Sequence, residues 1–335
     1  MDQYPLVSIC SPCYNHEAYL EDYFKGIISQ TYARIELILI DDASQDNSVD
    51  VIKRWLPKLN ERFERVVFIE NEKNQGIVKN CNKAILEAKG DYIKLFATDD
   101  IMLNNEIQVK IDAFIQDPEI DMLYGNGYIV KNDYSFGQDY RQFEKFNCNQ
   151  KATSGEALFQ RLLYSNFIPA PTCMIKKSIF TRFGLYDESI NQEDYEYWVR
   201  ISRFAKIGYI SKPTICYRRS VGSTSNFSGR NGELRFISMW GGKKKVLKKY
   251  IKYISPDKRK SYIDNFYRML LTDTMEYNYK DLAIRTYRMM KKLEIKLEND
   301  EKRDLILFLL NPFSKINIKK AYNFFYGLLI RKVKQ

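Results

Sequence analysis

The sequence feature that most constrains the fold is an alternation of short apolar runs with longer segments that carry apolar residues at helical spacing. Each run is short enough for one strand and ends in polar residues. Strands that alternate with helices of about 12 residues indicate βαβ units. We therefore predict an α/β fold with a mostly parallel central sheet flanked by helices. The apolar runs lie at 6–10, 35–40, 66–70 and 91–101, and the helical segments at 16–30, 49–59, 77–88 and 104–117.

The fourth apolar run ends in two adjacent carboxylates, Asp99 and Asp100. In an open α/β sheet, ligands bind beyond the carboxyl ends of the strands, so these acids are expected to point into a site. Adjacent acids repel each other, and a hard cation with a phosphate-bearing ligand is the usual reason for keeping them together. The alternative is that both acids cap the next helix, because Asp is a favoured N-cap residue.

Several classes of site are excluded by what the sequence lacks. No G-x-G-x-x-G follows the first run and no G-x-x-x-x-G-K-[ST] occurs, which excludes the usual dinucleotide and P-loop sites. The six cysteines are scattered and there is one His, so neither a disulfide framework nor a zinc site is expected. Met1 begins no basic and apolar leader, and no apolar run approaches the roughly 20 residues that span a bilayer. We therefore expect a protein of the reducing cytoplasm.

The net charge of +11 is unevenly distributed along the chain. Residues 241–335 hold 24 Lys and Arg against 10 Asp and Glu, whereas residues 1–240 hold 29 against 32. The basic part has helical spacing, and in 243–249 and 321–332 Lys or Arg flanks aliphatic and aromatic residues. Helices of this kind bind the surface of an anionic membrane. A solvated helical subdomain is the alternative, and nucleic acid is not expected because no nucleic-acid module accompanies the charge.

Five short motifs follow the predicted strands and one later helix in a fixed order. They are Pro12-Cys13-Tyr14-Asn15, Asp41-Asp42-Ala43-Ser44, Asn74-Gln75-Gly76, Ala97-Thr98-Asp99-Asp100 and Glu193-Asp194. Each motif is weak alone, but the ordered set resembles a family 2 glycosyltransferase of the bacterial surface-polysaccharide type, with the nucleotide-sugar-binding fold called GT-A. The resemblance predicts a GT-A domain at residues 1–225 and leaves residues 226–335 as a basic helical C-terminal region.

The resemblance implies a site for a nucleotide-sugar donor, first of all a UDP-sugar. Asp42 would read the edge of the uracil ring, because a carboxylate can accept the imide N–H. The alternative makes the loop around Asp42 an ordinary turn before a capped helix. Cys81 stands where the family commonly has Arg, which leaves the diphosphate to the metal and to Lys79. The other donor contacts would come from the first loop, through Pro12, Tyr14 and Asn15.

The metal motif of the family, usually Asp-x-Asp, is altered here because its first Asp aligns with Ala97. For members with this change, the resemblance implies that the last acid holds the metal and that its neighbour contacts the ribose or diphosphate. The metal is therefore assigned chiefly to Asp100, with Asp99 beside it as a second ligand and donor contact. With so few protein ligands, Mn²⁺ or Mg²⁺ would complete its octahedron with diphosphate oxygens and water.

Glycosyl transfer with inversion needs a base that takes the proton of the acceptor hydroxyl. The resemblance assigns this role to Asp194, with Glu193 beside the acceptor. Trp198, four residues later on the same helix face, would be an aromatic platform for the acceptor sugar. The alternative is a helix-dipole role for both acids. Residues 217–225 resemble a flexible basic loop that closes over the diphosphate, so Arg218 or Arg219 would contact phosphate. The alternative is a solvated loop.

Together these features predict a non-processive, inverting hexosyl- or N-acetylhexosaminyltransferase with a glycan or lipid-linked acceptor. A processive synthase is disfavoured because a Gln-x-x-Arg-Trp motif is missing. The alternatives are a non-catalytic nucleotide-binding module and a nucleotidyltransferase of similar fold, although the loop after the first strand lacks the glycines that the latter needs. We expect the protein in the cytoplasm, peripheral on the inner face of the cell membrane if its basic region binds lipid.

Overall fold

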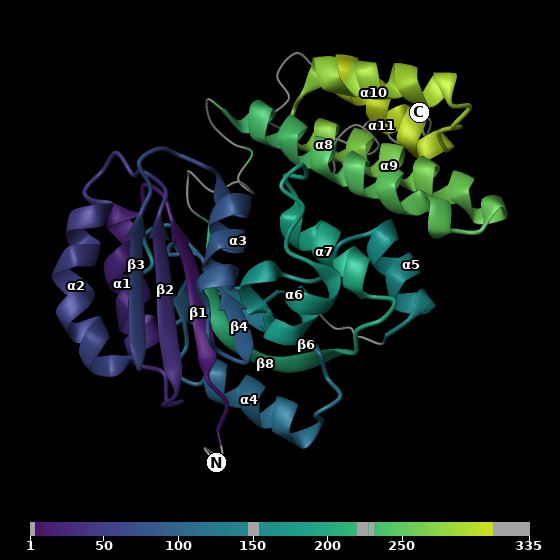
Figure 1. The fold of residues 1–335 in the computed structure, drawn as a ribbon. Coiled ribbons are helices and arrows are strands. Elements are labelled where there is room, and N and C mark those ends of the chain that lie inside the picture. Colours follow the sequence, from purple (N-terminus) through teal and green to yellow (C-terminus); the bar gives the residue numbers. More distant parts are fainter. Residues whose placement is uncertain (1–3, 147–153, 220–226, 228–230, 311–335) are drawn as a thin grey trace. The chain divides into compact units, whose positions relative to one another are not determined.

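The computed structural model describes residues 4–146, 154–219, 227 and 231–310 (Figure 1). The chain divides into two compact units, one formed by Met1–Asn226 with Gly241–Tyr250 and the other by Phe227–Trp240 with Ile251–Gln335. Residues 241–250, which we expected in the C-terminal region, thus group with the first unit.

The described part of the first unit is built on an eight-stranded sheet in the order β3-β2-β1-β4-β7-β6-β8-β5 (Figure 1). The pairs β3/β2, β2/β1, β1/β4 and β6/β8 run parallel, and the pairs β4/β7, β7/β6 and β8/β5 run antiparallel. The predicted α/β class with a mostly parallel central sheet is therefore confirmed. The strands are β1 (Val7–Cys13), β2 (Ile35–Asp41), β3 (Arg65–Glu70), β4 (Tyr92–Leu95), β5 (Ile101–Met102), β6 (Met122–Val130), β7 (Met174–Lys176) and β8 (Ile207–Arg218).

The parallel strands β1 and β2 are buried over their whole length, as their continuous apolar runs require. Three helices, α1, α2 and α4, share one hydrophobic cluster with Ile9 and Leu37 on one face of these strands. The helix α3 covers the other face, where the Cys10 thiol lies 3.6 Å from the carbonyl oxygen of Ala84. The four helices are α1 (Glu17–Ile28), α2 (Ser48–Arg62), α3 (Ile77–Glu87) and α4 (Glu106–Gln116).

The second half of this unit departs from the predicted pattern at β6. The sequence by itself predicts two strand pieces at 121–125 and 128–130, but Met122–Val130 is one strand. The intervening Gly125-Asn126-Gly127 is an irregularity in the register against β8, so glycines that resemble a turn in the sequence mark a β-bulge. The remaining elements are α5 (Glu156–Tyr164), η1 (Ala170–Thr172), α6 (Lys177–Phe183) and α7 (Glu193–Ile201).

A fully buried ionic group supports the strand that leads to the acidic pair. Glu106, at the start of α4, accepts hydrogen bonds from Lys94 of β4 and from Lys110, and all three side chains are buried. The Lys94 ammonium also donates to the carbonyl oxygen of Pro171 at 2.6 Å. Because a buried charge is tolerated only when it is paired, this group ties β4 to α4 and η1.

The second unit is helical in its described residues, as predicted for the basic region. Its small core joins Leu271, Met290 and Phe308. None of the described helices combines the length and the apolar character that crossing a membrane requires. The basic run at 321–332 lies outside the described residues. The helices are α8 (Gly232–Tyr250), which is shared by the two units, η2 (Ile251–Tyr253), α9 (Pro256–Glu276), α10 (Lys280–Lys292) and α11 (Asn299–Leu310).

Candidate active site

The loops after β1 and β2 are joined by hydrogen bonds at the carboxyl ends of these strands. The backbone N–H of Asn15 donates to the Ser44 hydroxyl at 2.9 Å, and the Asn15 side-chain oxygen accepts from the N–H of Gln45 at 2.7 Å. Asn15 has a φ of 54°, a left-handed conformation that Asn tolerates well. This turn leaves Tyr14 40% exposed directly after the buried end of β1, which includes Pro12. The predicted contacts of Pro12, Tyr14 and Asn15 with a nucleotide stay predictions.

The two acids after β2 have different partners. Asp41 accepts from the N–H and the hydroxyl of Ser44, which closes the turn. Asp42 instead accepts from the backbone N–H groups of Gln75 and Gly76 at 2.7 and 2.9 Å and from the Asn71 amide at 3.0 Å. The Asp42 side chain therefore binds the loop before α3 and does not close the turn, which argues against the ordinary-turn alternative for this residue.

The surroundings of Asp42 favour its ionised form. Burial by itself would raise the pKa of this carboxyl, but hydrogen bonds from Asn80, Gln75, Asn71 and Gly76 together lower the pKa below its usual value. The result is a buried, ionised carboxylate held in one orientation at the sheet edge. Such a group is suited to accept an N–H from the edge of a base.

The acidic pair follows β4 at the same edge of the sheet. Helix α4 begins at Glu106 and has Asn105 as its N-cap residue, so neither Asp99 nor Asp100 caps it. Asp100 is buried and accepts from the backbone N–H of Arg218 at 2.8 Å. Burial and the charge of Asp99 raise the pKa of Asp100 well above its usual range, although Arg218 opposes the shift.

The donor chemistry of this pair fits a hard divalent cation that it shares with a ligand. Asp99 and Asp100 offer carboxylate oxygens, which Mg²⁺ and Mn²⁺ prefer. A positive charge here would relieve the repulsion between the two acids. Among the described residues, no group of three or more His, Cys, Asp or Glu could hold a metal. Any cation would therefore need oxygens from the ligand and from water.

Arg218 does not lie in a flexible loop, and that prediction is wrong. It is the last residue of β8 and is 1% exposed. Its guanidinium donates to the carbonyl oxygens of Asp99, Asn132 and Tyr134 and pairs with Asp22 of α1 at 3.1 Å. Four of its five N–H groups are thereby used within the protein. Arg218 holds the acidic pair through its contacts with Asp99 and Asp100, and its guanidinium is not available to bind a phosphate.

Arg219 is the last described residue before the rest of the predicted loop. Its side chain is exposed, and its backbone N–H donates to the carbonyl oxygen of Val130 at 3.1 Å. Residues 220–225 of the predicted loop lie outside the described residues. The contact of Arg219 with phosphate therefore stays a prediction.

Glu193 and Asp194 are the first two residues of α7. Burial and the charge of Asp194 raise the pKa of Glu193 to about 8. Burial also raises the pKa of Asp194, despite opposing hydrogen bonds from the helix start and the charge of Lys243. The helix dipole by itself would lower these pKa values, so burial outweighs it here, and the role of Asp194 as a base stays a prediction.

The start of α7 lies close to Cys81 of α3, the residue at which the family commonly has Arg. The charges of Glu193 and Asp194 add to burial in raising the pKa of the Cys81 thiol. Cys81 is buried and stays a neutral thiol, so it serves packing.

Trp198 cannot be the exposed aromatic platform that we predicted. It is 1% exposed and packs edge to face with Tyr197 in the interior. Its indole N–H is buried and makes no hydrogen bond in the described structure. The spacing of four residues places Trp198 on the same helix face as Asp194. One turn further along α7, however, this face packs into the core.

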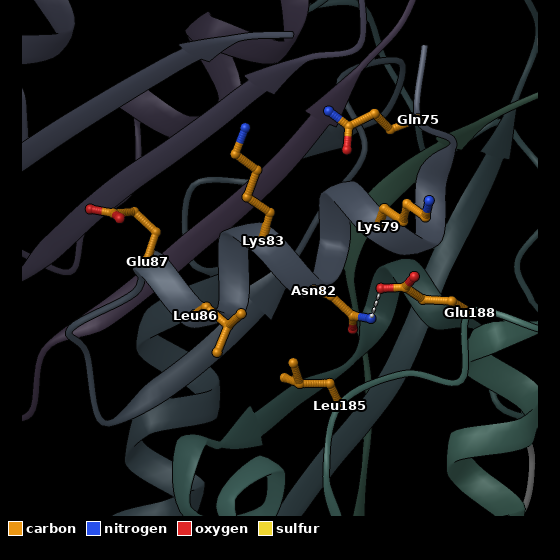
Figure 2. Close-up of a pocket in the computed structure, with 8 residues that line it drawn as sticks. All are labelled: Gln75, Lys79, Asn82, Lys83, Leu86, Glu87, Leu185 and Glu188. Atoms are coloured by element: carbon orange, nitrogen blue, oxygen red, sulfur yellow. Dashed lines mark hydrogen bonds between the residues drawn. The ribbon is translucent and has the colours of Figure 1, made fainter. Parts of the chain in front are cut away.

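Lys79 lines an open pocket of about 410 Å³ on the outer face of α3 (Figure 2). Asn82 joins this helix to the segment around Tyr186, which forms the opposite wall of the pocket. Its side-chain oxygen accepts from the N–H of Tyr186 at 2.9 Å, and its amide donates to the carbonyl oxygen of Tyr186 at 3.0 Å. The contact of Lys79 with a diphosphate stays a prediction. The other lining residues are Gln75, Lys83, Leu86, Glu87, Leu185 and Glu188.

Sequence reasoning missed His16, which links two of the motifs. Its backbone N–H donates to the Ser48 hydroxyl at 2.9 Å, and its ring nitrogen Nδ1 lies 2.7 Å from the Thr98 hydroxyl. The single His of the chain, directly after the first motif, was a signal that could have prompted this assignment. Through His16, the start of α1 is connected to the turn that carries Asp99 and Asp100.

Comparisons with known proteins agree with this arrangement. The sequence profile of glycosyl transferase family 2 matches residues 8–184, a little over half of the chain. The Escherichia coli UDP-Glc:alpha-D-GlcNAc-diphosphoundecaprenol beta-1,3-glucosyltransferase WfgD is 28% identical over 235 residues, which cover 70% of this chain and 84% of that protein. Glycosyltransferase GlyG of Streptococcus pneumoniae serotype 4 is 30% identical over 228 residues, which cover 65% and 72%.

Solved structures share the fold at low sequence identity. The structure of S. aureus TarS 1–349 in complex with UDP has a TM-score of 0.52 and 16% identity, and the match covers 90% of each chain. Mannosyltransferase PcManGT from Pyrobaculum calidifontis, in complex with GDP-Man and Mn²⁺, has a TM-score of 0.56 and 15% identity over 91% of this chain and 80% of the other. With the profile match, these findings show that the chain belongs to glycosyl transferase family 2 and is a glycosyltransferase with a nucleotide-sugar-binding fold.

Proposed function

We propose that this glycosyltransferase moves one sugar at a time, with inversion, from a UDP-sugar to a hydroxyl of a glycan or lipid-linked acceptor. The observation that carries the proposal is that the pKa values of two acids are shifted in opposite directions. Asp42 is held ionised by hydrogen bonds, whereas burial raises the pKa of Asp194. Such a separation of pKa values is what a binding carboxylate and a proton-accepting carboxylate need.

Asp42 would bind the base of the donor. One of its oxygens accepts from Asn71 and Gln75 and the other accepts from the N–H of Gly76, so the second oxygen keeps one lone pair for an N–H of the nucleotide. The related structures of TarS contain UDP or UDP-GlcNAc, and that of PcManGT contains GDP-Man. We favour uracil because its edge presents a single imide N–H between two acceptors.

Asp100 and Asp99 would hold a divalent cation, Mn²⁺ or Mg²⁺, as the Mn²⁺ in PcManGT suggests. When bound, the cation would offset the negative charge that develops on the departing nucleoside diphosphate. The N–H of Arg218 fixes Asp100, and the Arg218 guanidinium fixes the backbone of Asp99. The protein thereby keeps two mutually repelling acids in place.

Asp194 would accept the proton of the acceptor hydroxyl as the oxygen attacks the anomeric carbon. Its raised pKa brings its proton affinity closer to neutrality, where a general base is most effective. Glu193, whose pKa is raised to about 8, would be mostly protonated at neutral pH and could donate a hydrogen bond to the acceptor.

The donor assignment is tested by thermal unfolding with a panel of UDP-, GDP- and dTDP-sugars, each with Mn²⁺, with Mg²⁺ and with EDTA. We expect UDP-sugars with a cation to raise the unfolding temperature most. A ligand at 100 times its Kd adds about 2.7 kcal/mol of stability. Asp42→Asn should abolish the preference for uracil, whereas Asp112→Asn, an exposed acid on α4, should not change it. Equal stabilisation by all three nucleotides would contradict the donor assignment.

A non-catalytic nucleotide-binding module is the alternative from another class. An enzyme and a non-catalytic module would both bind UDP with a cation, so a binding measurement cannot distinguish them. Only an enzyme would hydrolyse one of the UDP-sugars slowly in the absence of an acceptor. We expect hydrolysis that is lost on adding EDTA.

We also propose that the acceptor is lipid-linked and that the basic C-terminal region meets the anionic membrane surface. The name of WfgD includes a diphosphoundecaprenol-linked sugar as acceptor, and residues 241–335 carry the excess of positive charge. Lys245 and Lys249 make contacts within the first unit, so they are not suited to a membrane test. Lys258 and Lys260 of α9 are exposed and are better suited.

Lys258→Glu with Lys260→Glu should weaken binding to vesicles that contain phosphatidylserine. Each basic residue near such a surface contributes about 1 kcal/mol, and the contribution falls as salt rises. Co-sedimentation at low and high salt measures the effect. Lys73→Glu with Lys89→Glu, exposed lysines of the first unit, is the matched control. Wild-type protein that ignores anionic vesicles at low salt would contradict the proposal.

A further inference from the structure

The second half of α8 docks on the segment that leads into α7. The Lys245 ammonium donates to the carbonyl oxygen of Ser189 at 2.6 Å, and the Lys249 ammonium reaches Asp187 at 2.7 Å. Lys249 also donates to Glu196, within α7, at 2.9 Å. Residues 245 and 249 are one helical turn apart, so both contacts come from one face of α8.

The docking is close at the level of the backbone. A Cβ atom at Gly242 would lie 2.8 Å from Cγ of Gln192 and 3.3 Å from its backbone nitrogen. Gln192 is the N-cap residue of α7, directly before Glu193 and Asp194. Gly242 lies on the same face of α8 as Lys245 and Lys249. A side chain at position 242 would push α8 away from the start of α7.

Glu196 is the centre of the contact. Its carboxylate is fully buried and accepts from Lys249 and from the Tyr250 hydroxyl of α8, and from Arg200 within α7. Burial opposes ionisation, but these partners together lower the pKa of Glu196. Arg200 in turn donates to the carbonyl oxygens of Phe183 and Leu185 at 2.9 and 2.8 Å. A buried ionised carboxylate with this many partners holds one geometry, because each lost partner leaves charge unpaired.

The segment before α7 is therefore held from two sides. Asn82 of α3 holds the backbone of Tyr186, while Lys249 of α8 holds Asp187 and Glu196. In the sequence, Asp194 lies between Asp187 and Glu196, the two residues that Lys249 contacts. Its position depends on contacts that start more than fifty residues later in the chain.

We infer that Lys249 is a positioning residue for Asp194, and that residues 241–250 of α8 are a structural part of the catalytic unit. This inference rests on the proposed role of Asp194 as the base. Lys249 touches no reacting atom; it sets the place and angle of the helix that carries the base. A general base that is displaced by about 1 Å can lose about 10²-fold in rate.

The experiment compares Lys249→Met with Lys248→Met in the full-length protein. Both variants remove one Lys charge from α8, but Lys249 contacts Asp187 and Glu196, whereas Lys248 lies on another face of the helix. We expect Lys249→Met to lower kcat for slow UDP-sugar hydrolysis or transfer by about 10- to 100-fold, with the Kd for UDP unchanged. Lys249→Arg, which keeps the charge and the reach, should restore part of the activity. Lys248→Met should behave as the wild type.

Hydrogen exchange by mass spectrometry gives a readout that does not depend on the base assignment. In Lys249→Met, amide exchange should become faster in residues 185–200 and stay unchanged in β1 and β2. Faster exchange throughout the first unit, together with weaker UDP binding, would overturn the inference, because Lys249 would then serve general stability alone.

The inference and the proposed function fail in different ways. Native kcat and native exchange in Lys249→Met, with activity lost in Asp194→Asn, would overturn the positioning role and leave the base assignment intact. Native activity in both variants with faster local exchange in Lys249→Met would overturn the positioning role as well, because Asp194 would then not be the base.

Discussion

Asp194→Asn is expected to lower the rate of sugar transfer by about 10²- to 10⁴-fold while the affinity for UDP hardly changes. The amide keeps the volume of the side chain but cannot take the proton of the acceptor hydroxyl, and loss of a positioned general base typically has an effect of this size. Asp42, Asp99 and Asp100, which would set donor affinity, follow other strands of the sheet. Transfer, or slow UDP-sugar hydrolysis, should be measured together with titration calorimetry of UDP and Mn²⁺.

Glu193→Gln is the matched control for Asp194→Asn. It changes the neighbouring acid in the same helical turn, and we expect a milder loss of rate if Asp194 alone is the base. A variant Asp194→Asn with near-native turnover, or one that loses UDP binding in step with activity, would show that the assignment is wrong.

Asp194→Asn is expected to leave the stability of the folded protein unchanged or to raise it at neutral pH. Burial raises the pKa of Asp194 in the folded protein above its value in the unfolded chain. Between the two pKa values the folded state binds more protons, so stability falls as pH rises through this window. Asn cannot ionise, so the variant does not lose stability as pH rises through this window.

The activity of the wild type should decline on the acid side at a pH above the ordinary range of Asp, because a base must be deprotonated to act.

Asp100→Asn is expected to abolish cation-dependent binding of UDP while the protein stays folded. The Asn side-chain oxygen can still accept the N–H of Arg218, so the backbone contact with β8 survives. The amide carries no charge, however, and one neutral oxygen is a poor replacement for a carboxylate in a site with so few protein ligands. Titration of UDP with and without Mn²⁺ should show that the difference between the two conditions disappears.

Asp99→Asn provides the comparison for Asp100→Asn. Asp99 is the second acid of the pair, so we expect a weaker but measurable loss of cation dependence. Circular dichroism and thermal unfolding check that both variants are folded. Unchanged UDP affinity with Mn²⁺ in Asp100→Asn would remove Asp100 from the metal site and leave it as a buried partner of β8.

The sequence by itself determined the order of β1 to β4 and α1 to α4 and the places where acids follow strands. Apolar residues with a period near two or near 3.6 are a local signal, and each element here is short and regular. It also determined the family, because the acid motifs keep their order along the chain. The choice between Asp41 and Asp42 was already made from the resemblance, and the hydrogen bonds of the structure agree with two separate roles.

Only the tertiary structure decided the surroundings of Arg218, Trp198 and Lys249. Arg218 pairs with Asp22, 196 residues away, and Lys249 bonds to Glu196, 53 residues away. A basic residue near a glycine has the same local pattern whether it lies in a loop or at the end of a buried strand. A lysine run likewise has the same local pattern whether it faces solvent or a buried carboxylate. Which of these occurs depends on the packing of distant elements, and the free energy of burying a charge is offset only when that packing brings its partner close.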